Sequence, residues 1–266
     1  MSTPQRPVDY DSIAMRYDDH RGWEQEIPLR LLALATGGAP GTGRAPLLEL
    51  GCGTGNVTRW LRAHWNGPLA ALDLSRGMLA KAQAKLRGVG LFRADARRLP
   101  LRDQSVRAAL GSFFLHHLDA PGRARLFSEL SRVLAVERST RASHGTRAGI
   151  AFLTSSHAQI RACSLARWMP SVPTIDCARF PDLDVLRAEL AGAGFAALAC
   201  ETIRRVEPRG DRTFLEKTRA RFLSTLDLVP EVEFTRGLAA MEAQLTADGH
   251  LGDVSWHATI VHGIAP

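Results

Sequence analysis

A glycine-rich bend between a short apolar run and an amphipathic stretch is the feature that most constrains how this chain can fold. Run and bend together read Pro46-Leu47-Leu48-Glu49-Leu50-Gly51-Cys52-Gly53-Thr54-Gly55-Asn56. A short, mostly apolar run is typical of a buried strand, and glycines at alternate positions let the backbone turn sharply and let a ligand approach it. The residues from 57 to 64 then have helical spacing. The sequence therefore predicts a strand, a tight turn with accessible backbone groups, and a helix.

The same alternation of apolar runs and amphipathic stretches continues from about residue 45 to 205, and it predicts an α/β core with a parallel sheet. The strands are expected at 46–50, 69–73, 90–94, 108–115, 148–153, 195–203 and 254–264, and helices at 57–64, 75–86, 123–134 and 183–193. With 266 residues, of which 45% are hydrophobic, the chain suits a single domain, residues 1–266, with additions to that core at 45–205.

Three segments lie outside the core pattern. Residues 8–35 are expected to form an N-terminal helical cap, and 155–182 and 207–252 to be insertions on the substrate side, the second with two helices. Long insertions at strand ends usually serve recognition. Their aromatic and sulfur-containing side chains are candidates for an apolar acceptor pocket or for ordinary core: Trp168, Met169, Phe180, Phe214 and Phe222. The polar stretch from 137 to 147 is expected to be an exposed loop.

Composition excludes several classes of protein. The formal charge is +7, but all except three of the 34 basic residues are arginine, and the densest basic stretches carry no interleaved aromatics, so we do not expect a nucleic-acid surface. Four scattered cysteines without a C-x-x-C pair indicate neither a disulfide framework nor a zinc site, and no carboxylate cluster indicates a metal. The start lacks a signal peptide's apolar segment and no apolar run is long enough for a membrane span, so we expect a cytoplasmic protein.

Acidic residues follow the strands at the positions where a nucleoside would be bound. Glu49 directly before the bend would repel a pyrophosphate, and Asn56 stands where a dinucleotide fingerprint needs its last glycine. Asp73, 18 residues beyond Gly55, ends the second strand, where a carboxylate accepts both hydroxyls of a ribose. Asp95-Ala96 follows the third strand and is placed to bind an adenine edge. These features predict adenosine recognition without a phosphate cradle.

This set of motifs, with Phe114-Leu115-His116-His117-Leu118 after the fourth strand, resembles the class I S-adenosylmethionine-dependent methyltransferases. It is most similar to the ubiquinone/menaquinone- and biotin-type small-molecule methyltransferases. The resemblance implies a Rossmann-like, seven-stranded, mostly parallel sheet flanked by helices, with the last strand inserted antiparallel. It also implies S-adenosyl-L-methionine as cofactor and S-adenosyl-L-homocysteine as its product.

The resemblance assigns cofactor contacts to particular positions. Around the methionine part it implies Glu49, Gly51, Cys52, Gly53, Gly55 and, at the carboxylate, Arg21; around the adenosine it implies Asp73, Leu74, Met78, Asp95 and Ala96; on the sulfonium side it implies Ser112 and Phe113, with Tyr17 near the transferred methyl group. The residues Tyr10, Ala14, Tyr17 and Arg21 have spacings that would place them on one face of a helix, where they either close over the cofactor or pack against the sheet.

His116 and His117 lie where open α/β sheets bind their ligands. One of them is a candidate catalytic base or acceptor-orienting group, and the alternative is that they bond to loop backbone. Because adjacent strand residues point to opposite sides, we expect at most one of the two to face the site.

The sequence thus predicts an enzyme that methylates an O, N or C atom of a small, partly apolar metabolite, in bacterial specialised metabolism, as a monomer or homodimer without a membrane partner. Two alternatives remain open. The first is an RNA or protein methyltransferase, which the basic charge favours, and the second is a relative that binds the cofactor without transferring its methyl group. The absence of a D/N-P-P-Y/W motif after the fourth strand argues against methylation of a base or a glutamine amide.

Overall fold

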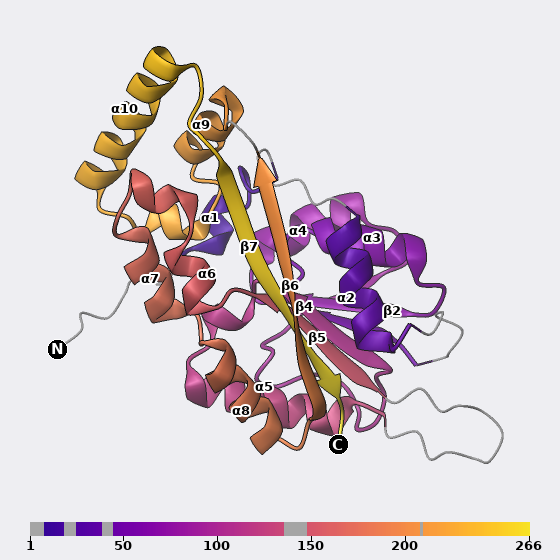
Figure 1. Ribbon diagram of the computed structural model, residues 1–266. Helices are drawn as coiled ribbons and strands as arrows, with labels where there is room; N and C mark the ends of the chain where they lie inside the picture. Colours follow the sequence, from indigo (N-terminus) through magenta and orange to yellow (C-terminus); the bar gives the residue numbers. More distant parts are fainter. Residues whose placement is uncertain (1–7, 19–24, 39–44, 136–147, 208–209) are drawn as a thin grey trace.

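The computed structural model describes residues 8–18, 25–38, 45–135, 148–207 and 210–266, and in this part of the chain seven strands form one sheet (Figure 1). Their order is β3-β2-β1-β4-β5-β7-β6. The strands are β1 (Leu47–Leu50), β2 (Leu69–Asp73), β3 (Gly90–Arg93), β4 (Ala108–Ser112), β5 (Gly149–Thr154), β6 (Ala196–Glu207) and β7 (Val254–Ile264). β1 to β5 pair in parallel, whereas β7 runs antiparallel to both of its neighbours. The predicted Rossmann-like sheet, with an antiparallel strand inserted next to its edge, is confirmed.

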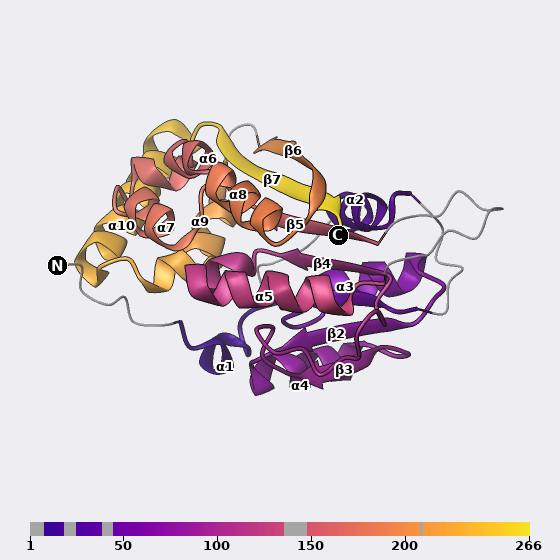
Figure 2. The ribbon, with the colours of Figure 1, turned by 90° about the horizontal axis from the view of Figure 1, so that it is seen from below.

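Helices cover both faces of the sheet because β1, β4 and β5 bury side chains on both sides. On one face lie α2 (Glu26–Thr36), α3 (Asn56–His64) and α4 (Arg76–Lys85), and on the other α5 (Ala120–Val133) and α8 (Leu183–Gly192), as Figures 1 and 2 show. Leu47 packs with the α2 and α3 side chains, and Leu48 with those of α5 and α8. The alternation of Leu47 and Leu48 along β1 thus builds both layers.

A group of helices lies beyond the sheet at the end where β4 and β5 finish (Figure 1). It comprises α6 (His157–Arg161), α7 (Val172–Arg179), α9 (Arg212–Arg219) and α10 (Glu231–Asp248), with short 3-10 turns η2 (Ser164–Arg167) and η3 (Ser224–Asp227). These elements share an apolar cluster of their own, which includes Met169, Phe214 and Met241. The helical end therefore forms a wall over the carboxyl ends of the parallel strands.

Strand β4 is shorter than its sequence predicts. It ends at Ser112, because Phe113 takes a left-handed backbone conformation with φ of 46° that a strand does not accommodate. The chain then forms the 3-10 turn η1 (Leu115–His117). The two histidines consequently lie on a turn rather than on a strand.

The predicted N-terminal helix carrying Tyr10, Ala14 and Tyr17 on one face is also wrong in length, since α1 (Tyr10–Ile13) is a single turn. The segment is held by side-chain bonds to the rest of the molecule instead. Asp11 Oδ1 accepts hydrogen bonds from Ser75 Oγ at 2.5 Å and from Gly77 N at 2.7 Å, at the start of α4. Arg21, expected at the same face, lies outside the described residues.

Candidate active site

The glycine bend joins β1 to α3 in a conformation that few other residues could adopt. Gly51 has φ of 64°, and a Cβ added there would lie 2.8 Å from the Phe114 Cβ. A Cβ on Gly53, with φ of 53°, would meet only the Tyr17 ring, whose Cε1 is 4.0 Å away. The absence of a side chain at Gly53 therefore leaves room between the bend and the Tyr17 ring.

Gly55 has a different role from the one the sequence resemblance implies. It is the N-cap of α3, and a Cβ there would lie 2.8 Å from Leu86 Cδ1 and 3.4 Å from Ala82 Cβ. This glycine permits close packing of α3 against α4 and does not line the cavity described below.

Asp73 ties the bend to the end of β2. Its Oδ2 accepts a hydrogen bond from Gly53 N at 2.8 Å, and its Oδ1 accepts one from Ser75 N at 2.9 Å. Burial raises the pKa of the Asp73 carboxyl above its usual value, and the two N–H bonds offset part of that shift. Because a carboxylate has about four lone-pair positions, both oxygens retain capacity for ligand hydroxyls.

Glu49 is the most unusual ionisable group of the site. Its side chain comes from the middle of the sheet, is 2% exposed, and leaves Oε2 without a hydrogen-bond partner among the described residues. Desolvation by burial raises the pKa of the Glu49 carboxyl to about 8. A buried carboxyl with an unused oxygen costs free energy unless a ligand compensates it, and a cation is the group best able to do so.

Asp95 lies just beyond β3 and forms a bidentate pair with Arg97, whose Nη2 and Nε are 2.6 Å and 3.0 Å from Asp95 Oδ2. The bonds to Arg97 hold the pKa of Asp95 below its usual range. Ala96, next to it, is buried. Both residues line the cavity, so a carboxylate and a neighbouring backbone stand at the carboxyl end of β3, as the sequence predicts for an adenine site.

Both histidines of η1 line the cavity, so the expectation that at most one would face the site is wrong. Their rings lie 3.9 Å apart, because successive residues of a 3-10 turn project about 120° apart rather than to opposite sides. His117 Nε2 is hydrogen-bonded to the Tyr10 hydroxyl at 3.0 Å. His116 stacks on Phe180 with ring centroids 4.1 Å apart. The Tyr10–His117 bond was not predicted, because a separation of 107 residues leaves no local signal in the sequence.

The N-terminal segment closes one side of the site through Asp18. Its Oδ1 accepts hydrogen bonds from Thr54 Oγ1 at 2.5 Å and from Asn56 Nδ2 at 2.9 Å, and its Oδ2 pairs with Lys85 Nζ at 2.5 Å. Asp18 thus bonds to two residues that flank Gly55. This anchoring places Tyr17 over the glycine bend.

One cavity of about 1410 Å³ brings the predicted residues together. All predicted site residues except Gly55 and the undescribed Arg21 line it: Tyr17, Glu49, Gly51, Cys52, Gly53, Asp73, Leu74, Met78, Asp95, Ala96, Ser112, Phe113, His116 and His117. Of the aromatic and sulfur candidates for an acceptor pocket, Phe180, Phe214 and Phe222 line the cavity. Met169 is completely buried in the helical cluster, and Trp168 donates a hydrogen bond to Gln244, so these two belong to the core of the helical end.

The sulfonium-side residues lie at the junction of sheet and helical end. Ser112 Oγ is buried without a hydrogen-bond partner among the described residues. The Phe113 ring makes edge contacts with Trp256 at 5.8 Å and with Phe180 at 6.4 Å between centroids. Trp256 is a cavity residue that the sequence did not single out. Together these rings form an apolar part of the cavity lining, the Phe113 cluster.

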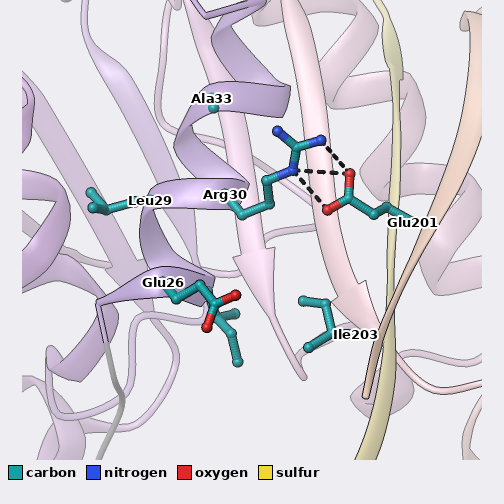
Figure 3. A pocket seen from close by; sticks show the side chains of 7 residues that line it. Glu26, Leu29, Arg30, Ala33, Glu201 and Ile203 are labelled. Carbon is teal, nitrogen blue, oxygen red and sulfur yellow. Dashed lines mark hydrogen bonds and ion pairs between the residues drawn. The ribbon is translucent and has the colours of Figure 1, made fainter. Parts of the chain in front are cut away.

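A second hollow of about 490 Å³ lies between α2 and β6 (Figure 3). Arg30 spans it and pairs with Glu201, with Arg30 Nε 2.7 Å from Glu201 Oε1. Since these charges satisfy each other, this hollow offers a ligand no unpaired charge. In the described part of the chain, no group of three or more His, Cys, Asp or Glu side chains could hold a metal, and no helix is long and apolar enough to span a bilayer.

In its fold and in the arrangement of this site, the core of this chain is similar to the class I S-adenosylmethionine-dependent methyltransferases. Residues 47–137 match the family described as a methyltransferase domain. The buried Glu49 carboxyl with its unused Oε2, beside an open bend, fits the positively charged end of this cofactor.

Curated relatives match about half of the chain. A ubiquinone/menaquinone biosynthesis C-methyltransferase of Acidiphilium cryptum is 34% identical over 141 residues, which are 47% of this chain and 52% of that protein. A malonyl-[acyl-carrier protein] O-methyltransferase of Methylococcus capsulatus is 32% identical over 131 residues, 48% of this chain and 46% of the relative. The match thus covers about half of each of these two proteins.

Solved structures extend the likeness in fold over nearly the whole chain. A protein of Anabaena variabilis, described as a methyltransferase from an antibiotic biosynthesis pathway, aligns with a TM-score of 0.69 at 19% identity, covering 92% of this chain and 98% of that one. Phosphoethanolamine N-methyltransferase 2 of Haemonchus contortus, solved with S-adenosyl-L-methionine, aligns with a TM-score of 0.58 at 17% identity, covering 96% and 57%. At these identities the likeness establishes the fold alone.

Proposed function

We propose that this protein transfers a methyl group from S-adenosyl-L-methionine to an O, N or C atom of a small, partly apolar metabolite. The observation that carries the proposal is a single cavity that joins acidic groups at the ends of β1, β2 and β3 to aromatic side chains of the helical end. The cofactor, when bound, supplies a methyl group on a cationic sulfur, and methyl transfer is then an in-line displacement. Alignment of nucleophile and methyl carbon is therefore the main task of the protein.

The cofactor half of the cavity supplies binding and orientation. Asp73 accepts hydrogen bonds from the ribose hydroxyls, and Asp95 with the backbone of Ala96 binds the adenine edge. Glu49 compensates positive charge at the methionine end, and Tyr17 covers the bend from the N-terminal segment. The Phe113 cluster excludes water from the point where the methyl group is transferred.

A proton must leave when the attacking atom is a hydroxyl, an ammonium or an acidic carbon. His117 is the residue that we assign to accept it, because it lines the cavity and is held by the Tyr10 hydroxyl. His116 has its ring stacked on Phe180 and is assigned to shape the acceptor side. Tyr10 is a positioning residue for His117, since it comes from the segment that closes the cavity.

A role in specialised metabolism agrees with the helical insertions, which form much of the acceptor side of the cavity, and with the antibiotic pathway given for the Anabaena variabilis protein. The alternative of an RNA or protein acceptor rests on the basic charge, yet many described arginines are engaged in ion pairs with carboxylates, such as Arg123 with Glu189 and Arg132 with Asp103. A cytoplasmic location agrees with four cysteines that are all free. We propose a monomer or homodimer.

Calorimetry with S-adenosyl-L-homocysteine, followed by mass spectrometry of small-molecule extracts incubated with enzyme and S-adenosyl-L-methionine, tests the proposal. We expect one-to-one binding of the by-product and a metabolite that gains one CH₂ group. The variant Asp73→Asn is the control and should lower both signals. Failure of the by-product to bind would refute the proposed site, whereas binding without any methylated product, across extracts, tRNA and protein, would favour the non-transferring alternative.

A further inference from the structure

The cavity has opposite charge at its two ends. The lining that precedes β5 in the chain, the cofactor half, has an excess of carboxylates even without Glu49, whose raised pKa leaves it mostly protonated at pH 7: Asp9, Asp11, Asp73, Asp95 and Asp119 against Arg93 and Arg97. The lining that follows β5, the acceptor half, has the reverse balance: Arg179, Arg205 and Lys217 against Asp176. A cavity with this polarity attracts a cationic ligand to one half and an anionic ligand to the other.

Arg179 is held rigidly in the acceptor half. Its Nη1 donates to Asp176 Oδ1 and to Thr225 Oγ1, each at 3.2 Å, and its Nη2 donates to Ser224 Oγ at 3.2 Å. Thr225 Oγ1 in turn donates to Asp176 Oδ1 at 2.6 Å. The guanidinium carries five N–H donors, and these bonds use three of them, which leaves donors for a ligand.

The burial of this cluster strengthens the electrostatic interactions of its charged side chains. The side chains of Arg179 and Asp176 are only 9% and 16% exposed, although both line the cavity. Burial raises the pKa of the Asp176 carboxyl above its usual value although Arg179 lies beside it. In such a setting a fixed guanidinium interacts strongly with a ligand that carries the opposite charge.

Lys217 is the second cation of the acceptor half. It lies on α9, one turn after Phe214, and both side chains line the cavity. Arg205 pairs with Glu26 at 2.9 Å and Lys85 with Asp18, but none of the described carboxylates forms an ion pair with Lys217. Its charge is therefore available to a ligand, in a chain that has only three lysines.

We propose that the acceptor carries an oxyanion group, a carboxylate or a phosphate, which Arg179 and Lys217 bind while its apolar part lies along Phe180, Phe214 and Phe222. This inference rests on the proposed methyl transfer, because it concerns the acceptor half of the same cavity. The oxyanion anchors the acceptor at the helical end, and the atom to be methylated then lies toward the Phe113 cluster.

Two fluorescent naphthalene probes, one anionic and one neutral, test this binding of an oxyanion. The first, 8-anilinonaphthalene-1-sulfonate, is anionic, and the second, N-phenyl-1-naphthylamine, is neutral. Each is titrated into protein saturated with S-adenosyl-L-homocysteine, for wild type, Lys217→Met, Lys217→Arg and the control Lys81→Met. Decanoate, decyl phosphate and decanol are then compared as competitors, so that carboxylate and phosphate recognition are distinguished.

We expect Lys217→Met to weaken binding of the anionic probe roughly tenfold and to leave the neutral probe unchanged. Lys217→Arg should retain wild-type affinity, Lys81→Met should have no effect, and the two anionic competitors should displace the probe better than decanol. Equal changes for both probes, or no change, with normal binding of S-adenosyl-L-homocysteine would overturn this inference alone. Loss of S-adenosyl-L-homocysteine binding in the wild type would instead overturn the proposed function.

Discussion

Cofactor binding should release a proton from Glu49, and the substitution Glu49→Gln should abolish that release. The carboxyl is buried in the sheet, and its pKa is about 8 in the ligand-free protein. At pH 7 it is therefore protonated in ~90% of the molecules, by the titration relation that links pKa and pH. A sulfonium and an ammonium group nearby favour the ionised form, so the pKa falls when S-adenosyl-L-methionine binds.

The number of protons released and the pH dependence of affinity both follow from this fall in the pKa of Glu49. When the pKa in the complex falls well below 7, binding at pH 7 releases ~0.9 protons per site, and affinity rises by up to tenfold per pH unit until pH approaches 8. Glu49→Gln should bind more weakly at pH 8 and show no such pH dependence. Because glutamine is neutral at every pH, this variant isolates the titration of one group.

Folding stability supplies a second, ligand-free measure of the same group. A carboxyl whose pKa is higher in the folded protein than in the unfolded chain lowers the stability of the fold most at high pH. The carboxyl ionises above pH 4.5 in the unfolded chain, whereas in the folded protein it keeps its proton up to about pH 8. The free energy of unfolding of Glu49→Gln relative to wild type should therefore grow by roughly 2–3 kcal/mol between pH 5 and pH 7.

Calorimetric titration in two buffers with different ionisation enthalpies measures the released protons directly, since the observed binding enthalpy then differs between buffers in proportion to the proton count. Urea unfolding at pH 5 and pH 7 measures the stability term. Identical enthalpies in both buffers for wild type, together with a stability difference that does not change with pH, would refute the reasoning.

Three further predictions follow from single contacts. Asp73→Asn should weaken S-adenosyl-L-homocysteine binding by roughly 2 kcal/mol in calorimetry, because a charge-assisted acceptor is lost; unchanged affinity would count against ribose binding there. His117→Ala should lower turnover by about 10²-fold at unchanged cofactor affinity. Tyr10→Phe should lower turnover less and should shift the pH profile of turnover. Wild-type turnover in the His117→Ala variant would exclude His117 as the base. Gly51→Ala should cost roughly 2–4 kcal/mol of unfolding free energy against ~1 kcal/mol for Gly88→Ala, because both have positive φ but only Gly51 would clash; equal costs would contradict this.

Local sequence was sufficient for the elements of the core. The bounds of β2 agree with the prediction to the residue, and those of β1 and β3 to within one residue, since buried apolar runs flanked by turn residues are strong signals. Prediction failed where long-range contacts replaced local preference. Helix α1 ends after one turn because Asp11 and Asp18 bond to residues of the bend and of α4, and β4 ends early because Phe113 turns into a left-handed conformation.

The candidate site divides in the same way. Glu49, Asp73 and Asp95 follow from the sequence because the carboxyl ends of neighbouring parallel strands meet at one edge of a sheet, whatever the loops do. The Tyr10–His117 bond and the Arg179–Asp176 cluster with Thr225 were beyond the reach of sequence analysis, since they join residues from separate elements.

The sequence by itself thus determined the strands of the core, the bend and the acidic residues at the strand ends, because these depend on periodicity and on residues adjacent in the chain. Only the tertiary structure decided that both histidines line the cavity, that Gly55 serves packing between two helices, and that Arg179 and Lys217 line the same cavity. These properties depend on side chains of α7, α9 and β7 that lie close together at one end of the sheet. Contacts between segments that are distant in the chain leave no signal in the local sequence.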